Sequence, residues 1–290
     1  MTVCAVVLAA GEGIRLRPLT LHVPKALCPV GNVTLLDRAL ARLAELGLRG
    51  PDQVAVNACH LADQVVAAVA GRAHMSVEPA PALGTSGGVA NLRGWIAGRG
   101  VLVCNADAYL AGAAPPGDTP VGDISTDLVT GWDRQTVRLL VVPATSGRPG
   151  EFGNPRRWRF AGMSLLPWEV VRDLPRTPSG LVSTVWRPAE AGGELELVPY
   201  HGRFLDCGTP ADYLAANLLA ADLDAGRNGS LVHPAATVRG RIVRGVVGAA
   251  ATVEGDLTRS VVWPGGYVGP CEHLSDAIRA ASDITVRARG

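Results

Sequence analysis

The stretch VVLAAGEGIRLRPLTLHVPKALCPV, residues Val6–Val30, contains the pattern that decides the fold. It continues a short apolar run, Val3–Ala10, whose length and β-branched residues are typical of a buried strand. Gly11 and Gly13 then interrupt the run. Glycines let the backbone turn sharply and approach a ligand closely, so we expect a ligand-binding turn at the end of this strand.

Three cationic residues, Arg15, Arg17 and Lys25, follow this turn. Because turn amides and side-chain charges can neutralise an anion together, they predict an anionic ligand, such as a polyphosphate. The glycines alone favour an ordinary strand-to-helix loop equally well. A dinucleotide-binding oxidoreductase is disfavoured, because Leu16 stands where that motif requires its third glycine.

The following segments alternate between helix and strand patterns. Apolar residues at helical spacing predict a helix over 35–48 and another over His60–Ala70, and the strands Gln53–Ala58 and Met75–Glu78 follow them in turn. This alternation predicts a doubly wound, Rossmann-like α/β domain with a parallel sheet. Ligands of such sheets bind beyond the carboxyl ends of the strands, where the Gly11 turn would lie.

The composition excludes several classes of protein. The chain has 290 residues, enough for one or two domains. Its 27 basic and 26 acidic residues leave a formal net charge of +1, so no basic field indicates a nucleic-acid partner. The apolar run Val3–Ala10 is too short to span a bilayer and has no signal-peptide pattern, so we expect a cytoplasmic protein without a membrane partner.

The cysteines show no metal-binding pattern. They are scattered, without a CxxC pair, and we expect buried, reduced thiols at Cys4, Cys28, Cys59, Cys104, Cys207 and Cys271. The histidines His233 and His273 are expected to be surface or core residues rather than catalytic groups.

Two segments in the middle of the chain carry further candidate groups. The stretch 79–88 is expected to form a loop that runs into a helix near Val89. Val101–Asn105 is an apolar strand pattern that delivers Asp107 to its carboxyl end. A carboxylate there is well placed to hold Mg²⁺ against a triphosphate, and a helix N-cap or turn aspartate is the alternative interpretation.

The whole segment from Leu8 to Val30 resembles the signature of sugar-1-phosphate nucleotidyltransferases, LAAGxGTRLRPLT followed by PK and a P-V pair. Ile14 stands where the family commonly has threonine. The resemblance implies that Arg15 neutralises the β- and γ-phosphates of a nucleoside triphosphate and Lys25 its α-phosphate. It also implies nucleotide contacts from the turn residues Leu8, Ala9, Ala10, Gly11 and Gly13.

Later segments extend the resemblance. The LGT-x-G segment implies base or ribose contacts at Gly84, Thr85 and Gly87, and two glycine segments imply sugar contacts at Gly153 and Gly162. The stretch RFLDCGTPADYL, residues 203–214, is similar to the family's W-x-D-x-G-T-P-x-D-Y segment, with Phe204 in place of tryptophan. It implies that Asp206 and Asp107 are the two ligands of Mg²⁺.

The tail differs in kind from the rest. From Val232 onward apolar residues recur at steps of four to six, which is a degenerate hexapeptide rhythm. It resembles the short left-handed parallel β-helix appended to many of these enzymes, and Ser260-Val261-Val262-Trp263 resembles one of their coils. We therefore expect a nucleotidyltransferase domain over 1–228 and a β-helix over 229–290 that serves oligomerisation or capping.

The resemblance implies transfer of a nucleoside monophosphate from a nucleoside triphosphate to a sugar 1-phosphate. The tail and its Ser260–Trp263 coil resemble those of mannose-1-phosphate guanylyltransferases, which implies GTP and mannose 1-phosphate as substrates. A related sugar or cyclitol phosphate would also fit. The family's usual glutamate-lysine-proline triplet is absent, as in N-acetylmuramate-1-phosphate uridylyltransferases. A catalytically silent regulatory homologue that binds nucleotide sugars is the alternative, and in either case a homo-oligomer is expected.

Overall fold

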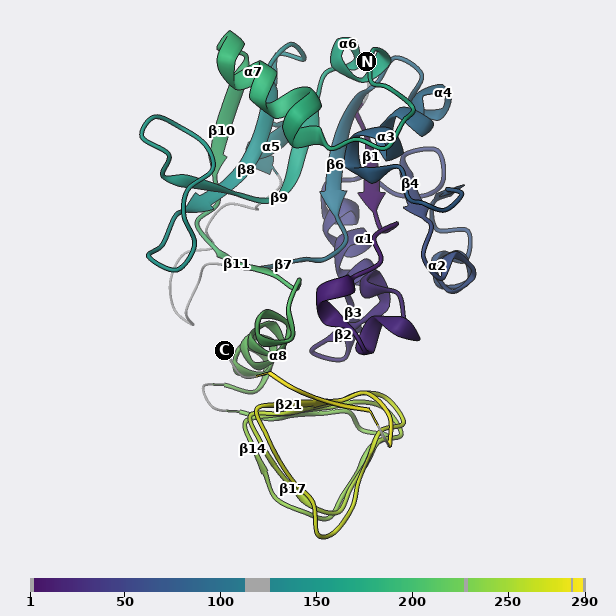
Figure 1. The fold of residues 1–290 in the computed structure, drawn as a ribbon, viewed down its shortest axis with the longest axis vertical. Helices are drawn as coiled ribbons and strands as arrows, with labels where there is room; N and C mark the ends of the chain where they lie inside the picture. Colours follow the sequence, from purple (N-terminus) through teal and green to yellow (C-terminus); the bar gives the residue numbers. More distant parts are fainter. Residues whose placement is uncertain (1–2, 113–125, 227–228, 283, 289–290) are drawn as a thin grey trace. The chain divides into compact units, whose positions relative to one another are not determined.

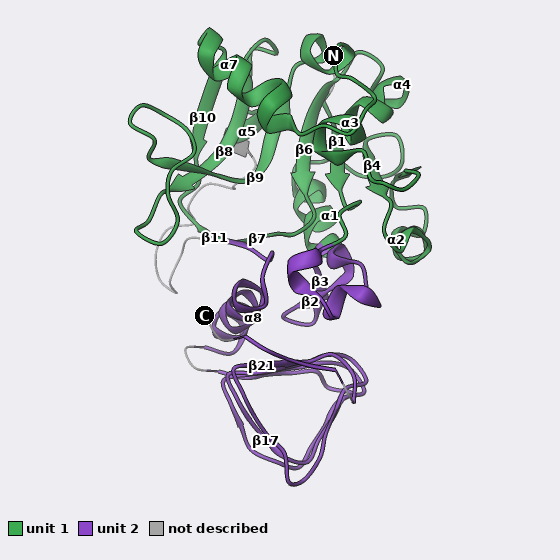
Figure 2. Ribbon diagram, in the orientation of Figure 1, with its two compact units in different colours: residues 1–12, 36–204 green, residues 13–35, 205–290 purple. Residues whose placement is uncertain are grey.

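The computed structural model describes residues 3–112, 126–226, 229–282 and 284–288 (Figure 1). Its internal contacts divide the chain into two compact units, coloured green and purple in Figure 2. The first unit comprises residues 1–12 and 36–204, and the second comprises 13–35 and 205–290. The signature segment is thus divided between the two units at Gly13.

The first unit is built on a seven-stranded sheet with the strand order β10-β8-β9-β6-β1-β4-β5. Strand β1 is parallel to β4 and β6, and β4 is parallel to β5. The strands are β1 Val3–Leu8, β4 Val54–Ala58, β5 His74–Val77, β6 Gly100–Asn105, β8 Val137–Pro143, β9 Trp158–Leu166 and β10 Leu195–Pro199. The predicted α/β class is confirmed, and most neighbouring strands of the sheet are parallel.

One strand departs from the predicted parallel sheet. Strand β9 is antiparallel to both of its neighbours, β6 and β8. No helix lies between β8 and β9 in the sequence, and parallel neighbours require a crossover connection of a dozen or more residues, usually a helix. The sheet is therefore mixed, with β10 and β8 forming a second parallel pair.

The helices follow the predicted pattern with shifted ends. In and around the first unit they are α1 Leu35–Glu45, α2 Ala62–Val69, α3 Gly84–Asn91, α4 Arg93–Ile96, α5 Thr126–Val129, α6 Trp168–Arg172 and α7 Arg187–Gly192, with a π-helical turn at Val182–Trp186. Between them and the sheet lies an apolar core that includes Val6, Val103 and Leu139. Within the described residues, no helix combines the length and the apolar character needed to cross a membrane.

The second unit begins with the rest of the signature segment. Three short 3-10 turns, Ile14–Leu16, Leu19–Leu21 and Lys25–Leu27, lead into a two-stranded hairpin, β2 Pro29–Val30 and β3 Val33–Thr34. Strand β11, Arg203–Asp206, crosses the division between the units and leads to helix α8, Pro210–Ala225. Helix α8 begins at Pro210, where Thr209 caps it by accepting a hydrogen bond from the Asp212 amide at 3.2 Å.

The remainder of the second unit is a series of short strands over 231–287, the C-terminal strand region. Successive strands visit three parallel sheets in turn, β12-β15-β18-β21, β13-β16-β19 and β14-β17-β20, and the coils trace a triangle in Figure 1. The strands are β12 Leu231–Val232, β13 Thr237–Val238, β14 Ile242–Val243, β15 Val246–Val247, β16 Thr252–Val253, β17 Asp256–Thr258, β18 Val261–Val262, β19 Tyr267–Val268, β20 His273–Ser275, β21 Ala277–Arg279 and β22 Thr285–Arg287. Val247, Val253 and Leu257 of the apolar rhythm fill the interior, whereas Val232, where the rhythm begins, is exposed.

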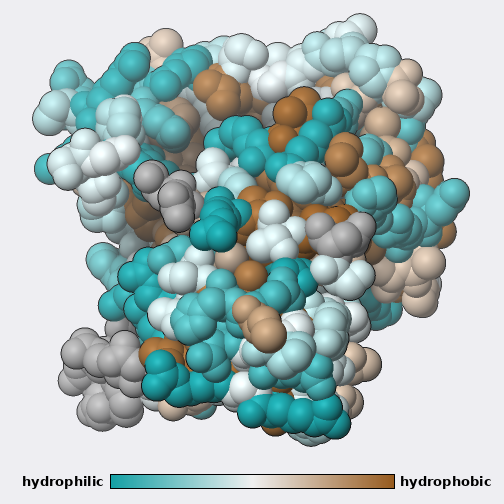
Figure 3. Space-filling model, turned by 60° about the horizontal axis from the view of Figure 1, so that its bottom comes forward, coloured by the Kyte–Doolittle hydropathy of each residue, from teal (hydrophilic) through white to brown (hydrophobic). Residues whose placement is uncertain are grey.

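Several large hydrophobic side chains of the second unit remain exposed. They include Ile14 and Val33 near the signature segment, and Val243 and Tyr267 in the C-terminal strand region. On the face drawn in Figure 3, hydrophobic residues are scattered among hydrophilic and neutral ones. Singly scattered apolar residues are normal on a protein surface.

Candidate active site

The carboxyl ends of the parallel strands lie at one edge of the sheet and bear several of the predicted residues. Leu8, the last residue of β1, pairs with Asn57 of β4 on one side and Asn105 of β6 on the other. The amide of Ala106 donates to the Leu8 carbonyl at 3.1 Å, which fixes the turn that carries Asp107. The structure thus brings Leu8 and Asp107 to the same edge of the sheet.

The turn after β1 is partly covered. Ala9 and Ala10 are each 7% exposed, whereas Gly11 is exposed. The half-buried Asp107 follows the end of the neighbouring strand β6. A ligand that approaches this edge would meet exposed backbone at Gly11, and the carboxylate of Asp107 belongs to the same edge.

A buried polar network, which sequence reasoning missed, supports this turn. Asn57 accepts a hydrogen bond from the Ala9 amide at 2.8 Å and donates one from Nδ2 to Glu78 Oε1 at 2.7 Å. The other carboxylate oxygen of Glu78 accepts from the Leu83 amide at 2.8 Å. The available signal was a polar residue near the end of each of two successive apolar strands. The network joins the signature turn to the start of helix α3.

Helix α3 begins at Gly84, earlier than predicted, and the expected loop over 79–88 ends at Leu83. Gly84 and Thr85 are exposed at the beginning of the helix, and Gly87 is buried within it. The Thr85 hydroxyl accepts a hydrogen bond from the Leu181 amide at 2.9 Å. The early start has a physical cause: Glu78 fixes the Leu83 amide, immediately before the first helical residue. Ligand contacts of this segment stay a prediction.

The two glycines predicted to contact the sugar occupy different surroundings. Gly162 lies in β9 and packs against Ala108, the residue that follows Asp107. Gly153 is half-buried after the buried Phe152, and its amide donates to Glu190 of helix α7 at 3.0 Å. The structure thus brings Gly162 close to the Asp107 turn and places Gly153 beside α7.

In the second unit, the two predicted phosphate-binding cations share one carboxylate. Lys25 Nζ and Arg15 Nη2 each lie 3.8 Å from an oxygen of Asp206. The Lys25 side chain is 13% exposed and the Arg15 side chain 67% exposed. The local group of two cations and one carboxylate has a net positive charge, which favours an anionic ligand.

Two glycines of this group have close neighbours at the position of an added Cβ. Gly13 has a φ of +63°, and a Cβ there would lie 2.8 Å from Thr20 Cγ2 and 3.2 Å from Lys25 Cβ. The Thr20 hydroxyl donates to the Gly13 carbonyl at 2.8 Å and fixes the loop. At Gly208 a Cβ would lie 2.5 Å from Arg15 Nη2, so the missing side chain provides room for the guanidinium. Ile14 is 62% exposed.

The cysteine prediction is confirmed for four residues and wrong for two. Cys4, Cys28, Cys104 and Cys207 are buried, whereas Cys59 is half-buried and Cys271 exposed because it lies in a turn of the C-terminal strand region. Burial raises the pKa of Cys4 to about 11 and that of Cys28 to about 12, so both thiols are protonated and unreactive at neutral pH. In the described part of the chain, no three His, Cys, Asp or Glu side chains are grouped to hold a metal ion.

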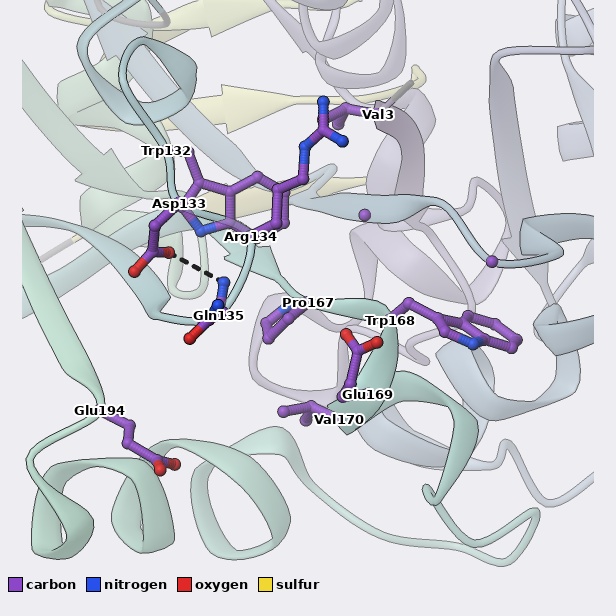
Figure 4. A pocket seen from close by; sticks show the side chains of 12 residues that line it. Val3, Trp132, Asp133, Arg134, Gln135, Pro167, Trp168, Glu169, Val170 and Glu194 are labelled. Atoms are coloured by element: carbon purple, nitrogen blue, oxygen red, sulfur yellow. Dashed lines mark hydrogen bonds between the residues drawn. The ribbon is translucent and has the colours of Figure 1, made fainter. Parts of the chain in front are cut away.

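A cavity of about 600 Å³ lies elsewhere in the first unit, at the amino ends of β1 and β6 (Figure 4). Val3, Gly100 and Trp132 are among its lining residues, and none of the predicted site residues lines it. Its polar groups include the Trp132 indole, which donates to the Thr136 carbonyl at 2.6 Å, and the Asp133 carboxylate, which accepts from the Gln135 amide at 2.9 Å. The cavity is separate from the candidate site, because it lies at the amino ends of β1 and β6 and the candidate site at their carboxyl ends.

The chain is similar to known nucleotidyltransferases. A family model described as MobA-like NTP transferase domain matches residues 5–114. The chain is 37% identical over 245 residues to the N-acetylmuramate alpha-1-phosphate uridylyltransferase of Neisseria meningitidis serogroup B, covering 74% of this chain and 97% of that protein. It is 29% identical over 252 residues to the mannose-1-phosphate guanyltransferase of Aspergillus fumigatus, covering 79% of this chain and 67% of that protein.

A solved structure with a similar fold is described as a putative glucose-1-phosphate thymidylyltransferase from Bacillus anthracis. It aligns with a TM-score of 0.60 and 17% identity over 78% of this chain and 98% of that one, which shows a shared fold. Family membership follows from the Neisseria relative, which the chain covers almost completely. With its signature turn at the carboxyl edge of the sheet and a MobA-like NTP transferase domain matched over 5–114, the chain belongs to the sugar-1-phosphate nucleotidyltransferases.

Proposed function

We propose that this protein transfers a nucleoside monophosphate from a nucleoside triphosphate to a sugar 1-phosphate. An oxygen of the sugar phosphate attacks the α-phosphorus, and the bond from that phosphorus to the bridging oxygen breaks and releases pyrophosphate. The observation that carries the proposal is the placement of the Leu8–Gly11 turn and Asp107 at the ends of adjacent strands. Ligands of doubly wound sheets bind at that edge.

The proposed roles follow the charges of the site. Backbone groups of Leu8–Gly11 and Gly13 bind the nucleotide, Arg15 neutralises the leaving β- and γ-phosphates, and Lys25 neutralises the α-phosphate. The pairing of both cations with Asp206 supports these roles, because it holds them at one place in the second unit. Catalysis then depends on positioning and on electrostatic stabilisation of the spreading charge.

We propose Asp107 and Asp206 as the protein ligands of Mg²⁺. Mg²⁺ prefers oxygen ligands and usually takes one or two carboxylates together with substrate phosphates, so each of these carboxylates is a donor of the kind that the ion takes. When bound, the ion would neutralise charge on the reacting phosphates. Without it, Asp206 still serves the site, because it orders Lys25 and Arg15.

Two substrate pairs are compatible with the relatives. The tail favours GTP and mannose 1-phosphate, and the Aspergillus relative is named as a mannose-1-phosphate guanyltransferase. The Neisseria relative, which the chain covers almost completely, is named as an N-acetylmuramate alpha-1-phosphate uridylyltransferase. We propose GTP with mannose 1-phosphate as the first pair to test, UTP with N-acetylmuramate 1-phosphate as the second, and related cyclitol phosphates after them.

We further propose that the C-terminal strand region is the predicted left-handed β-helix. The parallel pairing of β12 to β21 within three sheets that the chain visits in turn supports this interpretation, and only β22 is antiparallel to its neighbour. The domain division at 228/229, the homo-oligomer and the cytoplasmic location stay predictions. Exposed Val243 and Tyr267 offer apolar area for contact with a second copy of this chain.

The experiment is a pyrophosphate-release assay with Mg²⁺ across four nucleoside triphosphates and a panel of sugar 1-phosphates. We expect turnover with one pair and a loss of about a hundredfold or more in Asp107→Asn, because the reacting phosphates lose a charged partner. Asp63→Asn, which changes an exposed carboxylate in the first turn of α2, is the matched control and should keep wild-type activity. Full activity of Asp107→Asn, or silence of the wild type with every pair, would contradict the proposal.

A further inference from the structure

The hairpin β2–β3 follows Lys25 closely in the chain and is anchored from helix α8. Asn217, which is fully buried on α8, accepts a hydrogen bond from the Gly31 amide at 3.0 Å. Its Nδ2 donates to the Tyr213 carbonyl at 3.0 Å, one helical turn earlier. The tip of the hairpin is therefore fixed to α8 by a side chain that is itself held in one orientation.

Tyr213 adds a second anchor and connects it to the C-terminal strand region. Its hydroxyl donates to the Pro29 carbonyl and accepts a hydrogen bond from Trp263 Nε1 at 2.9 Å. The two rings are 6.2 Å apart, with 73° between their planes, and the residues are 0% and 5% exposed. Burial raises the pKa of the Tyr213 phenol well above its usual value, so the phenol keeps the proton that it donates.

A third contact reaches the hairpin directly from the C-terminal strand region. Asn32 Nδ2 donates to the Val247 carbonyl, the last residue of β15, at 3.1 Å. Val247 ends β15 and contacts the hairpin directly, whereas Trp263 follows the adjacent strand β18 and contacts the hairpin through Tyr213. Surface capping alone would not require buried hydrogen bonds aimed at this one hairpin.

Little chain separates these anchors from the phosphate-binding cation. The amide of Cys28 donates to the Lys25 carbonyl at 3.1 Å, and the Leu35 amide donates to the Cys28 carbonyl at 3.2 Å. Pro29 is the next residue, so a shift of Pro29 is transmitted to Lys25 through a hydrogen-bonded turn. Helix α8 itself begins at Pro210, shortly after Asp206, so the same helix is linked to both members of the ion pair.

We propose that Tyr213 and Trp263 are positioning residues, which hold Lys25 opposite Asp206 through the β2–β3 hairpin. The C-terminal strand region thereby sets the geometry of the nucleotide phosphate site, in addition to any role in assembly. This inference rests on the proposed function, in which Lys25 neutralises the α-phosphate. Neither aromatic side chain acts on the substrate itself.

The test uses the full chain and the variant Trp263→Phe, which removes the indole N–H and keeps an aromatic ring. We expect the KM for the nucleoside triphosphate to rise about fivefold, as loss of one buried hydrogen bond in the chain of contacts predicts. Val253→Ala is the control, because it removes methyl groups from the core of the same region without touching the hairpin. It should lower the Tm and leave the KM unchanged.

A double variant separates positioning from general loss of stability. Tyr213→Phe removes the hydroxyl that accepts from Trp263, so adding Trp263→Phe to it should raise the KM no further. Hydrogen exchange of the Cys28, Gly31 and Leu35 amides should be faster in Trp263→Phe than in Val253→Ala. If Trp263→Phe and Val253→Ala show the same KM and the same exchange of these three amides, Trp263 has only a structural role and the inference is overturned.

The proposed function fails independently of this inference. If the wild type releases no pyrophosphate with any substrate pair, the function is wrong. In that case the dissociation constants of GTP and UTP, measured by calorimetry, replace the KM. Weaker nucleotide binding with faster exchange in Trp263→Phe would still support the positioning role, and wild-type values of both would refute it.

Discussion

Asn57 donates a hydrogen bond of 2.7 Å to Glu78, and the two residues are only 1% and 3% exposed. Asn57 also accepts a hydrogen bond from the Ala9 amide, and Glu78 accepts one from the Leu83 amide. A buried carboxylate is costly unless it is hydrogen-bonded, and here both of its oxygens have donors. The pair therefore secures the signature turn and the start of helix α3 together.

Replacing Glu78 with glutamine should destabilise the fold. Both carboxylate oxygens accept hydrogen bonds, so the new amide NH₂ would face a donor at one of the two positions. We expect the free energy of unfolding to fall by about 1–3 kcal/mol, measured by urea denaturation. Glu45→Gln, at an exposed position at the end of α1, should stay within about 0.5 kcal/mol of the wild type. Equal stability of the two variants would contradict the role of Glu78.

The two glycines of the signature turn should respond differently to alanine. At Gly13 the φ of +63° is strained for alanine, and the new Cβ would press against Thr20. We expect Gly13→Ala to lose at least about 1–2 kcal/mol of unfolding free energy. No atom lies within 4 Å of a Cβ added at Gly11, so Gly11→Ala should change the free energy of unfolding by less than about 0.5 kcal/mol. The check is thermal and urea denaturation of both variants. A Gly11→Ala variant that is as unstable as Gly13→Ala, or less stable, would contradict the prediction.

Gly208→Ala should impair nucleotide binding with little effect on stability. Its Cβ would lie 2.5 Å from Arg15 Nη2, and the guanidinium would have to move away from Asp206. Because the Arg15 side chain is 67% exposed, its displacement should cost little folding free energy. We expect an unchanged Tm and a rise of about fivefold in the KM for the nucleoside triphosphate.

The effect of Gly208→Ala should depend on Arg15. In an Arg15→Gln background, the guanidinium is already gone, so Gly208→Ala should add little to the change in KM. Full additivity of the two substitutions in steady-state kinetics would show that Gly208 acts by another route.

Alkaline pH should destabilise the fold through buried thiols. Burial raises the pKa of Cys28 from 9.0 to about 12, so the folded state keeps a proton that the unfolded state loses. The resulting stabilisation is complete below pH 9 and is lost as the pH rises from 9 towards 12, by up to ~1.4 kcal/mol per pH unit for each such group.

The check is urea denaturation at pH 8 and pH 10. The unfolding free energy of the wild type should be lower at pH 10, and Cys28→Ala should show a smaller difference between the two values. Cys271→Ala, which removes an exposed thiol, should keep the pH dependence of the wild type. An identical pH dependence in Cys28→Ala would show that this thiol does not contribute.

Local patterns in the sequence determined much of the fold and part of the candidate site. The apolar run followed by Gly11 predicted strand β1 and its turn, and the strand pattern before Asp107 placed that carboxylate at the same edge. Much of the apolar spacing in the tail likewise matches buried positions of the C-terminal strand region, such as Val247, Val253 and Leu257. Such features depend on neighbouring residues, so periodicity and turn chemistry suffice to predict them.

Only the tertiary structure decided which distant side chains meet. Glu78 is 21 residues from Asn57, and Trp263 is 50 residues from Tyr213, yet both pairs are buried and hydrogen-bonded. The antiparallel pairing of β9 with β6 likewise joins segments that are far apart in the sequence. A hydrogen bond between remote segments leaves no periodic signal in either one, because its geometry exists only after the core between them has packed.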